Sequence, residues 1–140
     1  MKKFVGVISV LLLAMVLAAC GGGGSSTSGT PADAAKGFMD AFAALDVEKM
    51  KSFLCTAQAA AADGLATGFG EAGTEAKLDA SGLTYAVSNE TADSATVTIS
   101  GNIKAEVAGT STDLPATSMF PDGLVITKES GAWKVCPALP

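Results

Sequence analysis

The sequence has 140 residues and a formal net charge of −5, a size that suits one domain and excludes two ordinary ones. It contains no histidine, so the usual general base near neutral pH and the commonest metal ligand are both missing. All nine basic residues are lysines, so no arginine is present to hold a phosphate or carboxylate at two points. The acidic charge argues against nucleic-acid binding, which needs a basic patch.

The N-terminal residues are typical of an export signal. Lys2 and Lys3 form a basic start, residues 4–16 are almost wholly apolar, and a Leu-Ala-Ala sequence precedes Cys20. This arrangement resembles the lipobox of bacterial lipoproteins, which implies that the Cys20 thiol is acylated and that the signal is removed before it. A transmembrane anchor is the weaker alternative, because the apolar run is shorter than the ~20 residues that a span needs.

Removal of the signal leaves seven lysines and fourteen acids, a net charge of −7. Residues 21–29 are all Gly, Ser or Thr, a composition that cannot form a core and behaves as a flexible tether. The expected organisation is therefore a signal peptide (1–19), a lipidated cysteine with its tether (20–30) and one domain (31–140). We expect the N-terminal lipid to hold the protein on the extracytoplasmic side of the cell membrane or outer membrane.

Two further cysteines, Cys55 and Cys136, remain for the folded domain. Oxidising conditions outside the cytoplasm favour a disulfide between them. Two cysteines without histidine are too few ligands for a metal site, and a catalytic cysteine would lack its histidine partner. We therefore expect a structural disulfide, no metal and no other cofactor. The pairing requires the end of an early helix to lie beside the last strand, with Cα atoms within ~7 Å.

The first half of the domain is predicted to be helical. Thr30 is a candidate cap before Pro31, and Phe38, Phe42 and Leu45 recur at helical spacing behind it. Asp46 is a candidate cap for a second helix that ends near residue 55, and residues 56–63 are expected to be a third helical piece. Residues 64–82 are rich in glycine and are predicted to be mostly loop, with a weak helical turn near residues 71–78.

From residue 83 the apolar residues recur with period two, which is typical of strands. Gly101 lies in the middle of one long run and indicates a bulge or bend. Pro115 indicates that the expected strand over residues 114–120 either lies at the edge of the sheet or begins at this proline. The expected strands cover residues 83–87, 95–107, 114–120, 124–128 and 132–136, with turns at 89–93, 109–113, 121–123 and 129–131. This order predicts an α+β domain with helices packed on one face of an antiparallel sheet.

Two segments carry a resemblance to a known superfamily. Residues 34–54 (AAKGFMDAFAALDVEKMKSFL) and residues 124–135 (LVITKESGAWKV) resemble the opening helices and the final hairpin of nuclear-transport-factor-two-like (cystatin-like, ketosteroid-isomerase-like) domains, including those of bacterial lipoproteins of unknown function. The resemblance spans residues 31–136. It implies a curved sheet that folds around the long helix and leaves a conical cavity, which serves as an active site, a ligand pocket or a filled core in different members.

The residues expected to face this cone are apolar. They are ordinary core residues on one interpretation and the lining of a pocket for a small apolar ligand on the other; the candidates are Phe38, Phe42, Tyr85, Val97, Ile99 and Trp133. Enzymes of the superfamily place an Asp base or a His–Asp pair in the cone with a Tyr as oxyanion donor. Here Tyr85 is the sole tyrosine, Asp40 is expected to face water, and Asp79 is expected to precede the first strand as a cap or turn residue. We therefore predict no catalytic residue.

Two other patterns are interpreted as surface features. Residues 68–73 spell G-x-G-x-x-G, but no strand precedes them and no clear helix follows, so we predict a loop rather than a dinucleotide site. Glu71, Glu75 and Asp79 recur every four residues without matching a calcium-binding loop, which indicates a solvated face.

The predicted function is a non-catalytic, membrane-anchored domain that binds a small apolar ligand or an envelope protein. The alternatives are an enzyme that uses the cone (isomerase-, cyclase- or hydratase-like) and a structural docking module that forms a homodimer through its sheet. An open apolar cone would favour ligand binding, an inward Asp near Tyr85 would favour an enzyme, and a filled cone would favour docking.

Overall fold

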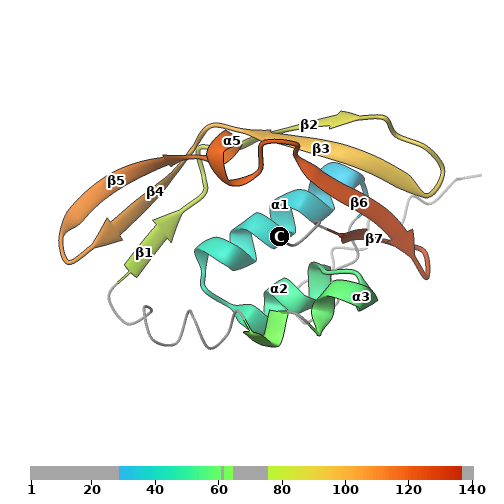
Figure 1. Ribbon diagram of the computed structural model, residues 1–140, viewed down its shortest axis with the longest axis horizontal. Coiled ribbons are helices and arrows are strands. Elements are labelled where there is room, and N and C mark those ends of the chain that lie inside the picture. The colour runs from blue at the N-terminus through green and yellow to red at the C-terminus, as the bar shows by residue number, and fades with distance from the viewer. Residues whose placement is uncertain (1–28, 61, 65–75, 137–140) are drawn as a thin grey trace, which may run out of the picture.

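The computed structural model describes residues 29–60, 62–64 and 76–136. Helices come first in the chain and strands follow (Figure 1). The elements are α1 (Pro31–Ala43), α2 (Val47–Phe53), α3 (Thr56–Ala59), β1 (Ala76–Asp79), β2 (Thr84–Ser88), β3 (Ser94–Ser100), β4 (Asn102–Val107), β5 (Thr110–Pro115), α5 (Ala116–Met119), β6 (Leu124–Glu129) and β7 (Ala132–Val135). Residues 62–64 are also helical. This order confirms the predicted α+β class.

Helices α1 and α2 begin at the predicted caps. The backbone N–H of Asp33 donates to the Thr30 hydroxyl at 3.1 Å, and the backbone N–H of Lys49 donates to the Asp46 carboxylate at 3.0 Å. Each cap satisfies a backbone donor that has no partner within its own helix. Gly37 brings the two helices close together, because a Cβ at this position of α1 would overlap the ring of Phe53 in α2.

The strands form two antiparallel sheets, one ordered β2-β3-β6-β7 and the other β1-β4-β5. The predicted run over residues 95–107 is divided at Gly101, so that β3 belongs to the first sheet and β4 to the second. Gly101 has a φ of 105°, a backbone conformation that residues with a Cβ rarely adopt. The predicted bend is therefore real, and it carries the strands around α1 (Figure 1).

The sequence-based interpretation of two segments is wrong. Residues 76–79, expected in a loop with a weak helical turn, form strand β1, in which Leu78 pairs with Ala105 of β4. Asp79 thus ends the first strand instead of preceding it. The strand expected over residues 114–120 is instead the end of β5 followed by α5, and β5 begins at Thr110, inside the predicted turn. Pro115 has no N–H for the sheet ladder, so the strand ends there.

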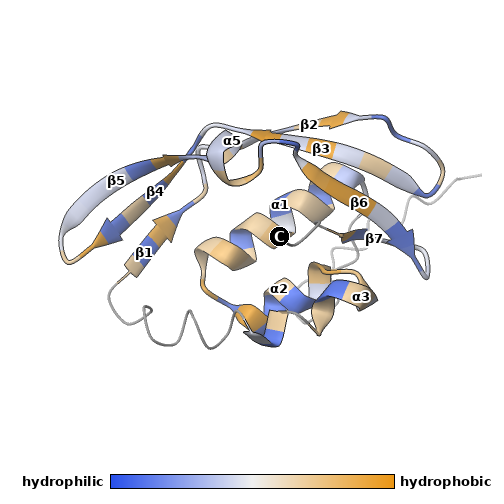
Figure 2. Cartoon of the chain, viewed as in Figure 1, coloured by the Kyte–Doolittle hydropathy of each residue, from blue (hydrophilic) through white to orange (hydrophobic). Residues whose placement is uncertain are grey.

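The core lies between α1 and the concave side of the sheets. Its fully buried side chains include Met39 of α1, Met50 of α2, Val97 and Ile99 of β3 and Ile126 of β6. Figure 2 shows apolar segments on α1, β3 and β6, which enclose this core. Ala116 of α5 is also fully buried, and its N–H donates to the carbonyl of Gly101 at 2.9 Å. The short helix α5 therefore seals the core at the bend.

Several predicted features lie outside the described residues. They are the signal peptide (1–19), Cys20, the tether up to residue 28, the G-x-G-x-x-G stretch at 68–73, and the acids Glu71 and Glu75. Among the helices that the structure does describe, none has the length and apolar character needed to cross a membrane.

Candidate functional site

Cys55 and Cys136 form a disulfide that joins the end of α2 to the end of β7. Their Cα atoms are 5.4 Å apart, within the range that a disulfide needs. Leu54 forms a parallel bridge with Val135, and the N–H of Cys55 donates to the carbonyl of Val135 at 2.9 Å. An early helix and the last strand are therefore neighbours, as the expected pairing requires.

The position of Cys136 also explains how the last strand serves both the core and the disulfide. Trp133 and Val135 of β7 are both buried on the core side, as alternation along a strand dictates. Cys136 follows the strand, and its N–H donates to the carbonyl of Val125 in β6 at 2.7 Å. The disulfide therefore fixes the end of the sheet and leaves its core face to Trp133 and Val135.

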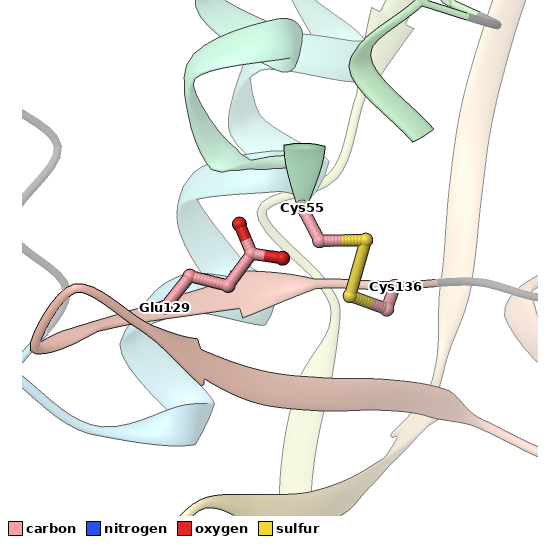
Figure 3. Close-up of side chains that lie close together, drawn as sticks. All are labelled: Cys55, Glu129 and Cys136. Carbon is pink, nitrogen blue, oxygen red and sulfur yellow. A yellow bond between two sulfur atoms is a disulfide. The ribbon is translucent and has the colours of Figure 1, made fainter. Parts of the chain in front are cut away.

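Glu129 lies beside the disulfide, with its side chain directed toward the two sulfur atoms (Figure 3). One carboxylate oxygen accepts from the N–H of Thr56 at 3.0 Å and from the Thr56 hydroxyl at 2.9 Å. The carboxylate and the two Sγ atoms lie within 4.8 Å of one another. Because a disulfide sulfur carries no proton, the Thr127 hydroxyl is the donor in its 2.9 Å contact with Cys136 Sγ.

No motif in the sequence marks Glu129 as a neighbour of the disulfide. Its position in a Glu-Ser-Gly turn indicated only a hairpin, and nothing local connects it to Cys55, 74 positions earlier in the chain. The connection depends on the parallel contact between Leu54 and Val135. The expected disulfide, combined with the expected final hairpin, was the one available signal that this turn lies near Cys55.

The six candidate pocket residues belong to one hydrophobic cluster. Phe38, Val97, Ile99 and Trp133 are buried in it, and Phe42 and Tyr85 are partly buried against it. Lys128 lies over the Trp133 ring, with its Nζ 5.2 Å from the ring centre, a distance that allows a favourable cation–π contact. These neighbours favour the core interpretation, and the lining of a ligand pocket by these six residues stays a prediction.

A shallow groove of about 400 Å³ lies elsewhere, between the second half of α1 and the end of β1. It is lined by Lys36, Asp40, Ala43, Ala44, Leu78, Asp79, Ala80 and Ser81. Lys36 and Asp40 form an ion pair at 2.6 Å across one turn of α1, and the Asp40 side chain is 46% exposed. Asp40 therefore faces water, as the helical spacing predicted.

Asp79 shapes the other wall of the groove. Its carboxylate accepts from the N–H of Ser81 at 2.8 Å, which forms a turn directly after β1. Hydrogen bonds from the Ser81 side chain and backbone lower the pKa of Asp79, and the charge of Lys104 lowers it further. Asp79 is thus held in its charged form as a turn residue, the poorer state for a general acid.

The pKa of Tyr85 lies well above the ordinary value for tyrosine. Burial raises the pKa to about 12, and the negative charge of Asp40 contributes to the rise. Both causes favour the neutral phenol. The folded state therefore binds the phenol proton more tightly than the unfolded state, so this group's contribution to stability is complete below about pH 10 and is lost as the pH rises toward 12.

This shift predicts the outcome of a spectroscopic titration. Because Tyr85 is the sole tyrosine, the ultraviolet absorbance of tyrosinate reports on it alone. We expect a midpoint near pH 12 in the folded protein and near pH 10 in denaturant. Asp40→Asn should move the folded midpoint downward, and Tyr85→Phe should remove the transition. A folded midpoint near 10 would mean that the phenol is solvated.

Comparison with known proteins identifies the fold. A putative calcium/calmodulin-dependent protein kinase type II association domain from Thiobacillus denitrificans superposes with a TM-score of 0.52 at 19% sequence identity, covering 79% of this chain and 96% of that one. The chain has the nuclear-transport-factor-two-like fold. No protein-family model and no curated protein matches the sequence. The nuclear-transport-factor-two-like fold confirms the helix-and-curved-sheet architecture that the two terminal segments implied.

Proposed function

We propose that the protein is a lipid-anchored, non-catalytic association domain on the extracytoplasmic side of the cell membrane or outer membrane. It binds a second copy of itself through the outer face of the β2-β3-β6-β7 sheet. The lipobox-like sequence at Cys20 supports the anchor and the location. The observation that carries the association is the exposed outer face of this sheet, whose opposite face is packed with buried apolar side chains.

The burial of the inner sheet face argues against the two other functions. Val97, Ile99 and Ile126 are fully buried and pack in one hydrophobic cluster. Asp40 is the carboxylate whose charge raises the pKa of Tyr85. Its side chain is exposed to solvent and paired with Lys36. A base in this position has an ordinary aqueous environment and lacks the burial that tunes catalytic carboxylates. These features support a non-catalytic role.

The outer sheet face has the composition of a flat contact surface. Ser88, Thr96 and Val125 form one row across β2, β3 and β6, because Thr96 pairs with both of the others. Ala86 and Thr98 form the next row. Val125 is 45% exposed at this face. Small side chains allow two such faces to approach closely, and Val125 supplies an apolar centre.

The similar solved structure also supports self-association as the function, since that protein is described as an association domain. Fold similarity alone does not assign a function. The proposal therefore depends on the exposed face of this chain, which can be tested directly.

Val125→Lys is expected to weaken self-association. In a face-to-face dimer the substitution adds two like charges to one interface, and such juxtaposition costs several kcal/mol. Sedimentation velocity of the lipidated protein in detergent should show a dimer for the wild type and a dissociation constant at least about 100-fold higher for the variant. Val107→Lys is the matched control, because Val107 is 52% exposed but belongs to β4 of the other sheet.

Two results would contradict this proposal. A wild-type protein that stays monomeric over the whole concentration range would exclude self-association. Equal weakening by Val107→Lys would place the contact on the β1-β4-β5 sheet. Retention of the wild-type circular dichroism spectrum in both variants shows that the substitutions leave the fold intact, so that a change in dissociation constant reports on the interface.

A further inference from the structure

The surroundings of the disulfide contain a third group that a structural cross-link does not require. The two Sγ atoms and the Glu129 carboxylate lie within 4.8 Å of one another (Figure 3). We refer to these three groups as the Cys–Glu cluster. Two thiolates and a carboxylate are ligands that Zn²⁺ accepts, and three protein ligands with a water molecule complete a tetrahedral site.

We propose that the reduced form of the protein binds one thiophilic divalent cation of the Zn²⁺ class in the Cys–Glu cluster. A thiol reductant supplies two electrons and two protons to the disulfide, which becomes two thiols, while the reductant is oxidised to its own disulfide. The cation then displaces both thiol protons to solvent and binds the two thiolates and the carboxylate. In the reverse direction, thiol–disulfide exchange passes the two electrons of the thiolates to the oxidised, disulfide form of the reductant, which re-forms the Cys55–Cys136 bond and releases the cation.

The geometry after reduction suits this exchange. Once the S–S bond opens, the two sulfur atoms separate to van der Waals contact. Tetrahedral coordination with Zn–S distances of about 2.3 Å places two thiolates about 3.8 Å apart. This separation is close to sulfur–sulfur van der Waals contact, so the side chains need only a small rotation. The cation would also offset the repulsion among three negative groups that otherwise disfavours the thiolate forms.

Backbone contacts hold both cysteines in place in addition to the disulfide. The N–H of Cys55 donates to Val135, and the N–H of Cys136 donates to Val125. Leu54 and Val135 also form a parallel bridge. Because these contacts hold α2 against the sheet end, the two thiols of a reduced protein remain close together.

Glu129 and Thr127 are also held in place. Thr56 donates two hydrogen bonds to one carboxylate oxygen of Glu129, Oε2, and the side chain is directed toward the two sulfur atoms (Figure 3). The Thr127 hydroxyl contacts Cys136 Sγ, and such outer contacts orient metal ligands and increase affinity. Glu129 is thus a ligand in this proposal, and Thr127 is a positioning residue.

The test uses the full chain, reduced with a phosphine that offers no competing thiol, and titrated with Zn²⁺ and with Co²⁺. We expect one cation per chain, a thiolate-to-cobalt charge-transfer band, and a higher thermal midpoint for the reduced protein in the presence of Zn²⁺. The oxidised protein and the Cys55→Ser/Cys136→Ser variant should bind none. That double variant also excludes a contribution from Cys20, the third cysteine.

Glu129→Gln distinguishes the cluster from a simple pair of thiols. We expect its affinity for Zn²⁺ to fall by at least about tenfold. Glu106→Gln, which changes an exposed acid of β4, should leave the affinity unchanged. The proposal is overturned if the reduced wild type binds no stoichiometric cation, if it loses its native circular dichroism spectrum, or if Glu129→Gln binds as tightly as the wild type.

Discussion

Replacement of both Cys55 and Cys136 by alanine is expected to lower the free energy of unfolding by about 4.5 kcal/mol. The sequence separation of 81 residues is large, so the disulfide removes much conformational freedom from the unfolded chain. For a domain whose total stability is about 5–15 kcal/mol, this loss is severe. Guanidinium denaturation followed by Trp133 fluorescence, with a chelator present, measures the effect.

Reduction provides the matched control for this experiment. A reductant should destabilise the wild type by a similar amount and leave the double variant unchanged. If the variant loses less than about 1 kcal/mol, the disulfide does not contribute through chain entropy. Retention of the native spectrum before denaturation shows that the comparison concerns folded proteins.

Gly101→Ala is the second substitution with a large expected effect, about 3 kcal/mol of destabilisation. The φ of 105° is strained for any residue with a Cβ. In addition, an alanine Cβ would overlap the carbonyl oxygen of Gly82, a backbone atom that has little freedom to move. Both penalties fall at the junction of the two sheets. Thermal and denaturant unfolding of the purified variant test this expectation.

Gly109→Ala separates the two penalties. Gly109 also has a positive φ, of 79°, but an added Cβ has no atom within 4 Å. We expect it to cost about 1 kcal/mol from backbone strain alone. Equal losses at both positions would mean that the close approach of Gly82 to the bend does not matter for stability.

The helical half of the fold is predicted well from sequence because its signals are local. Thr30 and Asp46 cap their helices with hydrogen bonds to residues three positions later. The final hairpin is equally local, since its Gly turn and alternating residues lie within one short segment. Such features depend on neighbours in the chain, so the sequence displays them directly.

Features that depend on distant partners were not predicted. Strand β1 has four residues and follows a glycine-rich segment, and its pairing with β4 supplies the ladder that stabilises it. Helix α5 forms because Ala116 fits the core at the bend, where its N–H reaches Gly101. The position of Glu129 depends on how the helical half meets the last strand. Tertiary contacts override weak local preferences in all three cases.

The candidate site shows the same division. Because only two cysteines remain for the folded domain, the sequence was enough to pair Cys55 with Cys136. The carboxylate beside them could be located only in the three-dimensional structure. The exposed position of Asp40 followed from helical periodicity. Whether the cone is filled could not follow from composition, because the volume left between α1 and the sheets depends on the bend at Gly101.

The positions of the two bonded cysteines give the domain a covalent topology with a practical consequence. All seven described strands lie between Cys55 and Cys136, so the entire sheet belongs to one closed ring. A protease that cuts a single peptide bond anywhere in this ring opens it without releasing a fragment. A nicked molecule would keep its mass on a non-reducing gel and would separate into two pieces only after the sulfur bridge is broken.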